Sequence, residues 1–138
     1  MIEVLIRDKP LDIKSCYQQV KDAAAGGIDV FVGTVRNQTK EKKVLRLEYE
    51  AYAPMAEKEI RRIIEKAAAN WKIIHAVVHH RIGTLMPEEE AVIIALSTAH
   101  RQAAFEACKY IIDEMKQTVP IWKKEVFENG EEWVSAHP

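Results

Sequence analysis

The segment at residues 97–125, SAHRQAAFEACKYIIDEMKQTVPIWKKE, constrains the fold most, because a helical pattern and a strand pattern meet there at one proline. Apolar residues at helical spacing predict a helix over residues 101–118, with an inward line of Ala104, Cys108, Ile111 and Met115. Pro120 ends that helix, and the following IWKKEVF alternates with the period of a strand. The chain therefore folds back at Pro120, which can bring Lys116 and Lys123 together.

The start of this helix suits an anion. Ser97 and Thr98 are residue types that cap helix N-termini, and the cationic side chains of His100 and Arg101 follow at once. Free backbone N–H groups and the helix dipole favour negative charge at the same place. We therefore predict that a phosphate or carboxylate can dock there.

Strand and helix patterns alternate along the whole chain without a linker, a repeat or a low-complexity block. The pattern predicts one domain over residues 1–138. Gly33 lies inside an apolar run and indicates a bulge or a close backbone approach. Residues 37–43, NQTKEKK, are wholly polar and are predicted to form a mobile loop. The expected strands are residues 1–7, 28–36, 45–52, 73–82 and 91–97, followed by a C-terminal hairpin of 121–127 with 131–135 around Asn129-Gly130. Two further helices are expected, one over residues 12–24 that is capped by Asp12 and one over residues 54–71. Residues 83–90 are expected to form a turn-rich loop.

Composition narrows the possible partners. The 138 residues are 48% hydrophobic, which suits one compact domain with a core. No apolar run is long enough to cross a bilayer, and the N-terminus resembles a strand rather than a signal peptide, so we expect a soluble cytoplasmic protein. The net charge of −1 gives no global attraction to nucleic acid or to a membrane. Anion binding must therefore come from a local basic pocket.

The cysteines and the histidines of residues 73–82 do not indicate a metal site or a disulfide. Cys16 and Cys108 fall in expected helices without CxxC spacing, so neither a disulfide nor a zinc site is predicted, and Cys108 is expected to be a buried small hydrophobe. His75 and His79 share one strand face but lack a companion cluster, which favours a structural or surface role over a metal site. Three aromatic residues are expected to anchor the core or an interface: Trp71, Trp122 and Trp133.

Five short segments, in this order, resemble the large, catalytic subunit of molybdopterin synthase. They are FVGTVR (31–36), LEYEAY (47–52), HRIG (80–83), SAHRQAAFEA (97–106) and MKQTVPIWKKE (115–125). Each segment alone is weak evidence for the family, because short motifs recur by chance, but five segments in the same order over nearly the whole chain are specific evidence. The resemblance implies an α+β fold: a single domain with a mainly antiparallel sheet, helices packed on it in a hammerhead-like arrangement, and a C-terminal β-hairpin.

The resemblance also implies a reaction and partners. Members of the family convert cyclic pyranopterin monophosphate (precursor Z) into the dithiolene of molybdopterin, in molybdenum cofactor biosynthesis. The sulfur arrives as a thiocarboxylate on the C-terminal glycine of a small ubiquitin-like partner subunit, whose tail enters a pocket of the large subunit. Large subunits pair with each other, which gives a heterotetramer with two small subunits. No cofactor and no metal are expected.

Position by position, the resemblance assigns site residues. Lys116 and Lys123 match active-site lysines, and four residues match the substrate and tail pocket: Phe31, Arg36, His100 and Arg101. Two neighbouring ammonium groups disfavour each other's charge, so one can become a nucleophile or proton acceptor while the other stays cationic. We predict direct chemistry for Lys116 and an orienting, charge-stabilising role for Lys123. Lys124 is expected to be a solvated lysine of an edge strand.

Alternatives remain open at this point. His100 can instead cap its helix or form an ordinary hydrogen bond, and the two arginines can be ion-pair residues. The chain can be a non-catalytic module that binds the tail of a ubiquitin-like protein, or, in last place, a small oligomeric anion sensor. Lys40, Lys42 and Lys43 of the polar loop can close over a phosphate. His137 stands where some family members have an arginine near the pocket.

Overall fold

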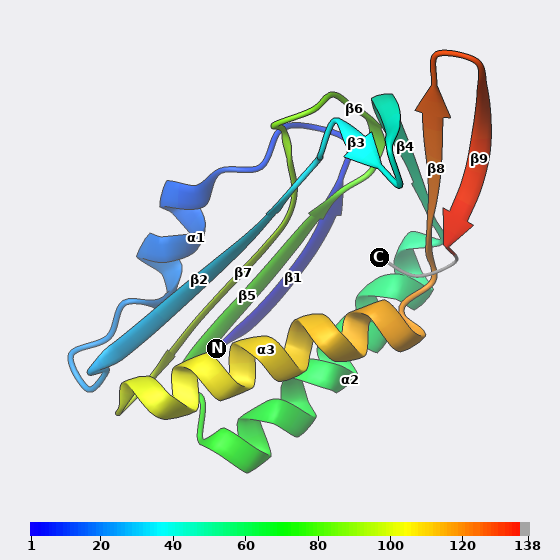
Figure 1. Cartoon of the computed structure of the whole chain (residues 1–138). Helices are drawn as coiled ribbons and strands as arrows, with labels where there is room; N and C mark the ends of the chain where they lie inside the picture. The colour runs from blue at the N-terminus through cyan, green and yellow to red at the C-terminus, as the bar shows by residue number, and fades with distance from the viewer. Residues whose placement is uncertain (136–138) are drawn as a thin grey trace.

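The computed structural model describes residues 1–135, and its strands form two sheets (Figure 1). The first sheet has the strand order β1-β5-β7-β2, and the second has the order β3-β4-β8-β9 with β6 paired to β4. Only the β1–β5 pair is parallel within the described residues. The elements are β1 (Ile2–Arg7), α1 (Ile13–Val20), β2 (Gly27–Thr34), β3 (Gln38–Thr39), β4 (Lys42–Ala51), α2 (Ala53–Trp71), β5 (His75–Arg81), β6 (Gly83–Leu85), β7 (Glu90–Thr98), α3 (Arg101–Thr118), β8 (Ile121–Phe127) and β9 (Gly130–Ser135).

Helices cover both faces of the first sheet. Helices α2 and α3 lie on one face and α1 lies on the other, as Figure 1 shows. The alternation of β5 divides its side chains between two cores, because successive residues of a strand point to opposite faces. Ala76 and Val78 join the large core under α2 and α3, whereas Val77 packs with Cys16 and Val20 of α1. The predicted α+β class, with mostly antiparallel pairing and a C-terminal hairpin, is confirmed.

Helix α3 has the predicted bounds, but its start differs from the prediction. Ser97 and Thr98 do not cap the helix, because both belong to β7 and are fully buried. The N-cap position is His100, and its side chain makes no capping hydrogen bond. A Cβ on Gly27 would lie 2.9 Å from the Cα of Arg101, so this glycine allows β2 to pass close to the helix start.

Helix α1 is shorter than predicted. Asp12 caps it as expected, with its side chain accepting a hydrogen bond from the backbone N–H of Ser15 at 3.2 Å. The helix ends at Val20, however, rather than near Ala24. The Asp22 side chain accepts from the N–H of Ala24 at 2.8 Å, and this local hydrogen bond competes with continuation of the helix.

The second sheet corrects two further predictions. Residues 37–43 do not form an open loop, because Gln38–Thr39 pairs with β4 through a tight turn in which Lys40 and Glu41 have φ values of 48° and 69°. Strand β8 is not an edge strand, since it lies between β4 and β9. The hairpin of β8 and β9 was predicted correctly, and Phe127 pairs with Gly130 beside its turn.

The remaining predicted features also have clear outcomes. The register between β2 and β7 shifts at Gly33, where a Cβ would lie 2.7 Å from Val92 Cγ1, so both the bulge and the close approach are confirmed. Trp71 packs against the large core, whereas Trp122 and Trp133 are exposed and belong to no core. Among residues 1–135, no helix is both long and apolar enough to span a membrane.

Candidate functional site

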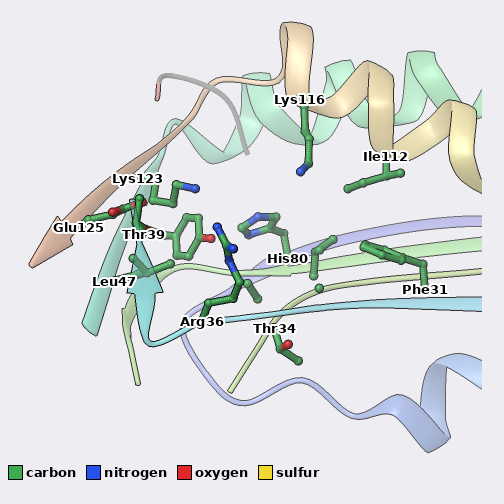
Figure 2. Close-up of a pocket in the computed structure, with 14 residues that line it drawn as sticks. Phe31, Thr34, Arg36, Thr39, Leu47, His80, Ile112, Lys116, Lys123 and Glu125 are labelled. Carbon is green, nitrogen blue, oxygen red and sulfur yellow. The ribbon is translucent and has the colours of Figure 1, made fainter. Parts of the chain in front are cut away.

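A cavity of about 220 Å³ lies where the two sheets meet under the C-terminal half of α3. Strands β2, β4, β5, β7 and β8 contribute to its walls, so segments that are distant in the sequence meet there. Figure 2 shows side chains from α3, from β8, from the end of β2 and from β5 pointing into one space. The polar lining is Thr34, Arg36, Thr39, Tyr49, His80, Lys116, Lys123 and Glu125, and the apolar lining includes Phe31, Leu47, Val92 and Ile112.

Lys116 and Lys123 both line this cavity, as the turn at Pro120 allows. Lys116 is exposed near the end of α3, whereas Lys123 is half-buried on β8. Burial lowers the pKa of Lys123, and the positive charges of Lys116 and Arg36 lower it further against the opposing effect of Glu125. The two lysines therefore lie close enough for one to affect the protonation of the other.

Arg36 reaches the same cavity from the residue pair that follows β2. Its neighbour Val35 is clamped by two backbone hydrogen bonds, one donated by Val35 to the carbonyl of Glu89 at 3.0 Å and one donated by Glu88 to the carbonyl of Val35 at 2.8 Å. Phe31 lies on β2 and lines the same cavity. Neither Arg36 nor Arg101 forms an ion pair within residues 1–135, which leaves both guanidinium groups open to an anion.

Three buried polar residues of the lining were not predicted as site residues: Tyr49, His80 and Glu125. They are 8%, 1% and 5% exposed, respectively. Burial lowers the pKa of His80 to about 4, and burial with the charge of Glu125 raises the pKa of Tyr49 to about 12. Oε2 of Glu125 is buried and has no hydrogen-bond partner within the described residues. All three lie in segments that carried the family resemblance, but nothing in the local sequence marks them as chemical groups.

His100 and Arg101 do not join this cavity within one chain. Both are exposed at the start of α3, and neither belongs to the lining. Lys116 lies 15 residues further along the same helix, a rise of roughly 22 Å at 1.5 Å per residue. The predicted anion-docking end and the lysine end of the helix are therefore separate places in a single copy.

Lys124 differs from its prediction. Its side chain is only 18% exposed, and its Nζ lies 3.7 Å from Glu48 Oε1 and 3.6 Å from Glu131 Oε2. The ammonium group also lies 5.3 Å from the centre of the Trp133 ring. Since β8 is flanked by β4 and β9, Lys124 links three strands instead of standing in solvent at an edge.

The cysteines and the strand histidines have structural partners. Burial raises the pKa of Cys16 to about 11 and that of Cys108 to about 12, so both are protonated thiols. Sγ of Cys16 lies 3.3 Å from Nδ1 of His79, whose Nε2 lies 2.7 Å from Oε2 of Glu3. His75 Nε2 lies 2.9 Å from Oδ2 of Asp22. The part of the chain that the structure describes holds no cluster suited to a metal ion.

The lysines of the 37–43 segment do not converge. Lys40 lines an open cleft with Arg36, Pro87 and Glu88, next to the cavity. Lys42 Nζ, in contrast, lies 5.3 Å from the centre of the Phe127 ring, and Lys43 pairs with Glu128 at 3.7 Å. Lys40 alone is placed to meet a ligand of the site. His137 lies outside the described residues.

Comparison with known proteins agrees with this geometry. The profile of the MoaE protein family matches residues 6–118. The molybdopterin synthase catalytic subunit of Bacillus subtilis is 45% identical over 129 residues, which are 94% of this chain and 82% of that protein. The human catalytic subunit is 46% identical over 123 residues, which are 89% of this chain and 65% of the human protein.

Solved structures extend the likeness to the fold. The crystal structure of molybdopterin synthase from Staphylococcus aureus matches with a TM-score of 0.89 and 40% identity over 96% of each chain. A complex of subunits 1 and 2 of molybdopterin-converting factor from Helicobacter pylori shares the fold, with a TM-score of 0.71 and 19% identity.

Fold and site together define an α+β protein that gathers three cationic side chains around a small, partly apolar cavity. The chain belongs to the MoaE family, and the resemblance found in its sequence is confirmed.

Proposed function

We propose that this protein is the catalytic subunit of molybdopterin synthase and that it transfers sulfur to cyclic pyranopterin monophosphate, with residues 1–138 as one domain in the cytoplasm. The observation that carries the proposal is the convergence of Arg36, Lys116 and Lys123 on one cavity. A cyclic phosphate needs fixed positive charge, and the fork of an arginine suits phosphate oxygens. The apolar part of the lining suits the flat face of a pterin.

The chemistry needs an acyl–sulfur bond to be broken. The sulfur of a thiocarboxylate forms a bond to a carbon of the pterin side chain, and the carbon–oxygen bond at that carbon breaks, with the oxygen leaving as water or as the freed phosphate ester oxygen. Water then adds to the acyl carbon and cleaves the acyl–sulfur bond, which leaves a carboxylate on the sulfur donor and a thiolate on the pterin side chain. Negative charge develops on the acyl oxygen during that cleavage, and a neighbouring ammonium group stabilises it. We assign direct chemistry to Lys116, which is exposed beside the cavity, and orientation with charge stabilisation to Lys123.

The sulfur donor in this proposal is a small ubiquitin-like subunit that carries a thiocarboxylate on its C-terminal glycine. The two-subunit complex from Helicobacter pylori supports a small partner for proteins of this fold. An extended tail that ends in glycine is narrow enough to enter a cavity of about 220 Å³. Its terminal group would then lie beside Lys116 and Lys123.

A second copy of the chain would place His100 and Arg101 in the site. Strand β2 ends the first sheet, and its Gly27 end lies against Arg101 whereas its Thr34 end lines the cavity. Antiparallel pairing of two β2 edges about a two-fold axis would set the Gly27 end of one copy beside the Thr34 end of the other. His100 and Arg101 of each copy would then face the cavity of its partner, within a heterotetramer of two large and two small subunits.

Reconstitution tests the reaction. Purified protein is mixed with the thiocarboxylated small subunit and cyclic pyranopterin monophosphate, and molybdopterin is measured. We expect Lys116→Ala to abolish transfer and Lys123→Ala to reduce it by roughly 100-fold or more, since each removes an interaction of the transition state. Lys124→Ala is the matched control and keeps its activity. A wild-type protein that binds the small subunit but forms no product would support the tail-binding module instead.

Subunit complementation tests the shared site. We expect Lys116→Ala and Arg101→Ala copies to be inactive alone, but a mixed dimer would contain one intact site if the two residues come from different copies. Random mixing then restores about a quarter of the wild-type activity, since half of the dimers are mixed and each has one of two sites. A mixture that stays inactive would place both residues in the site of one chain and contradict the β2 arrangement.

A further inference from the structure

The imidazole of His80 has a fixed tautomer. Its Nδ1 lies 2.8 Å from the carbonyl oxygen of Arg81. A carbonyl oxygen only accepts, so Nδ1 carries the proton and Nε2 is a bare acceptor. No hydrogen bond to Nε2 occurs within residues 1–135, although His80 is only 1% exposed. Unlike Oε2 of Glu125, Nε2 of His80 is not fully enclosed, so it can accept a hydrogen bond from a molecule in the cavity that His80 lines.

The position of His80 directs that acceptor to the reaction site. His80 lies on β5 and lines the cavity with the two lysines, and Figure 2 shows its ring rising from the sheet toward α3. The ring also meets Tyr49 edge to face, with 5.2 Å between the ring centroids. The hydrogen bond to the carbonyl of the next residue, Arg81, and the ring contact with Tyr49 therefore hold the orientation of the imidazole.

The cationic lining cannot perform the task of this acceptor. Arg36, Lys116 and Lys123 have only donors, so they bind the phosphate and the acyl group but leave the N–H groups of a pterin ring without partners. Burial keeps the His80 imidazole neutral at physiological pH, because its pKa is lowered to about 4. A neutral acceptor can lie among cations without neutralising them, whereas a protonated histidine would repel them.

We propose that His80 is a further substrate-contacting residue, whose Nε2 accepts a hydrogen bond from a ring N–H of the pterin and so orients the pterin side chain toward Lys116. This inference rests on the proposed function, and it assigns a role to the HRIG segment. The contact exists in both the bound substrate and the transition state, so it contributes to affinity more than to the chemical step.

Two variants isolate the acceptor. His80→Phe keeps an aromatic ring against Tyr49 but removes both nitrogens, and with Nδ1 the hydrogen bond to the Arg81 carbonyl. His80→Gln offers an amide oxygen that can reach the place of Nε2, so an affinity loss that glutamine rescues is the loss due to Nε2. We expect His80→Phe to bind cyclic pyranopterin monophosphate about tenfold more weakly, which corresponds to the loss of one hydrogen bond. Its KM should rise by a similar factor while kcat stays within about threefold, and His80→Gln should recover most of the affinity.

A spectroscopic measurement on the wild-type protein is independent of how the variants fold. The chain has five histidines, so the ¹⁵N signals of the imidazoles are few, and the spectrum of His80→Phe assigns the signal of His80. We expect the Nε2 signal of His80 to move toward that of a hydrogen-bonded nitrogen when the pterin is added. If the assigning variant does not fold, the correlation of Nε2 with the Nδ1 proton held by Arg81 identifies the signal.

The outcomes separate this inference from the proposed function. Wild-type protein that binds and converts the pterin, with an unmoved Nε2 signal and an unchanged affinity in His80→Phe, overturns the role of His80 alone. Wild-type protein that does not bind the pterin overturns the proposed function together with this inference. A moved signal with a KM effect that glutamine rescues supports both.

Discussion

Arg81 and Glu89 form an ion pair that holds the backbone beside Arg36, with Nη1 of Arg81 2.8 Å from Oε2 of Glu89. The other carboxylate oxygen of Glu89 accepts from the N–H of Met86 at 2.7 Å and closes the turn after β6. In the same turn, the carbonyl of Glu89 accepts from the N–H of Val35, and the N–H of Glu88 donates to the carbonyl of Val35. Arg81 therefore reaches the site indirectly, through a turn, while its neighbour His80 lines the cavity.

Glu89→Ala is expected to loosen this turn. The variant loses one charge-assisted hydrogen bond and one backbone hydrogen bond, together about 1 kcal/mol for a partly exposed group, so amide exchange at Val35 and Glu88 should accelerate roughly fivefold. Glu89→Gln keeps one acceptor oxygen but puts an NH2 donor in place of the other, so it should accelerate exchange less than Glu89→Ala does. Unchanged exchange at Val35 in the alanine variant would show that the turn does not depend on the pair.

The same carboxylate predicts a pH effect. The N–H of Met86, and then Arg81, hold the pKa of Glu89 below its usual range. The contribution of Glu89 to stability is therefore present above the pKa of an unfolded glutamate and is lost as the pH falls through the lowered folded value. The thermal stabilities of wild-type protein and Glu89→Gln should therefore converge as the pH falls below the pKa of an unfolded glutamate, about 4.3. Plots of melting temperature against pH that stay parallel for the two proteins below about pH 4 would contradict this.

Gly33→Ala tests the close approach of β2 to β7. Its added methyl group would lie 2.7 Å from Val92 Cγ1, and overpacking of this kind costs about 1–3 kcal/mol. Val92→Ala makes space, so the double variant should be more stable than the sum of the single changes by about 1 kcal/mol. Thermal unfolding of the four proteins gives this coupling, and strictly additive effects would place the strain elsewhere.

Lys123→Met should stabilise the protein while it strongly reduces sulfur transfer. Burial and two nearby cations lower the pKa of Lys123 against the opposing charge of Glu125, so folding disfavours its charged form. Removal of the charge should therefore raise the free energy of unfolding at neutral pH. The exposed Lys116 is the control, because Lys116→Met should change stability little. A Lys123→Met protein less stable than wild type would mean that the attraction of Glu125 for the charge of Lys123 outweighs the cost of burying that charge.

The pH dependence of this difference has a definite sign. Between the lowered folded pKa and the ordinary lysine value, the unfolded state binds more protons than the folded state. The stability of wild type relative to Lys123→Met should therefore rise with pH through this window. Denaturant unfolding at a series of alkaline pH values measures the difference, and a flat difference would indicate an unshifted lysine.

Lys124→Met should weaken the C-terminal hairpin without loss of activity. The methionine keeps an apolar stem near Trp133 but loses both ion pairs, and we expect a cost of about 1 kcal/mol for this largely buried group. Trp133 is one of three tryptophans, so fluorescence in a variant that keeps only this tryptophan reports the hairpin. Unchanged hairpin stability would mean that the crossing ion pairs contribute nothing.

Replacement of both cysteines by alanine should leave transfer from a supplied thiocarboxylate intact. Cys16 and Cys108 are buried, and both have raised thiol pKa values, so neither offers a thiolate at neutral pH. We expect some loss of thermal stability because the alanines leave small voids. A folded double variant that has lost transfer would indicate that one of the cysteines carries sulfur.

Elements with a strong local pattern could be predicted from the sequence. Helix α3 has the bounds that its apolar spacing and Pro120 indicated, and the C-terminal hairpin lies at its expected glycine. The hairpin at residues 37–43 was missed because its strands are polar and its turn uses Lys40 and Glu41 at positive φ in place of glycine. The caps proposed for α3 were wrong because β7 continues through Thr98.

The site could be predicted only in part. Lys116 and Lys123 are near in sequence, and a turn at Pro120 was enough to bring them together. His80 and Glu125 become buried only when β5 and β8 meet α3, a long-range event without a local signal. The separation of His100 from Lys116 follows from helix length. The role that we propose for both residues in one site would need a contact between copies, which has no local signal in the sequence.

The outer edge of β2 also bears on solubility. The strand GIDVFVGT carries one charged residue, no proline and an exposed Phe31, and its outer N–H and C=O groups face no other strand of the described chain. Such an edge is a template for aggregation unless something covers it. A second copy seated on β2 would protect the protein against aggregation at the same edge where, in the arrangement that we propose, it would complete the reaction site. Variants that separate the copies should then precipitate as well as lose activity.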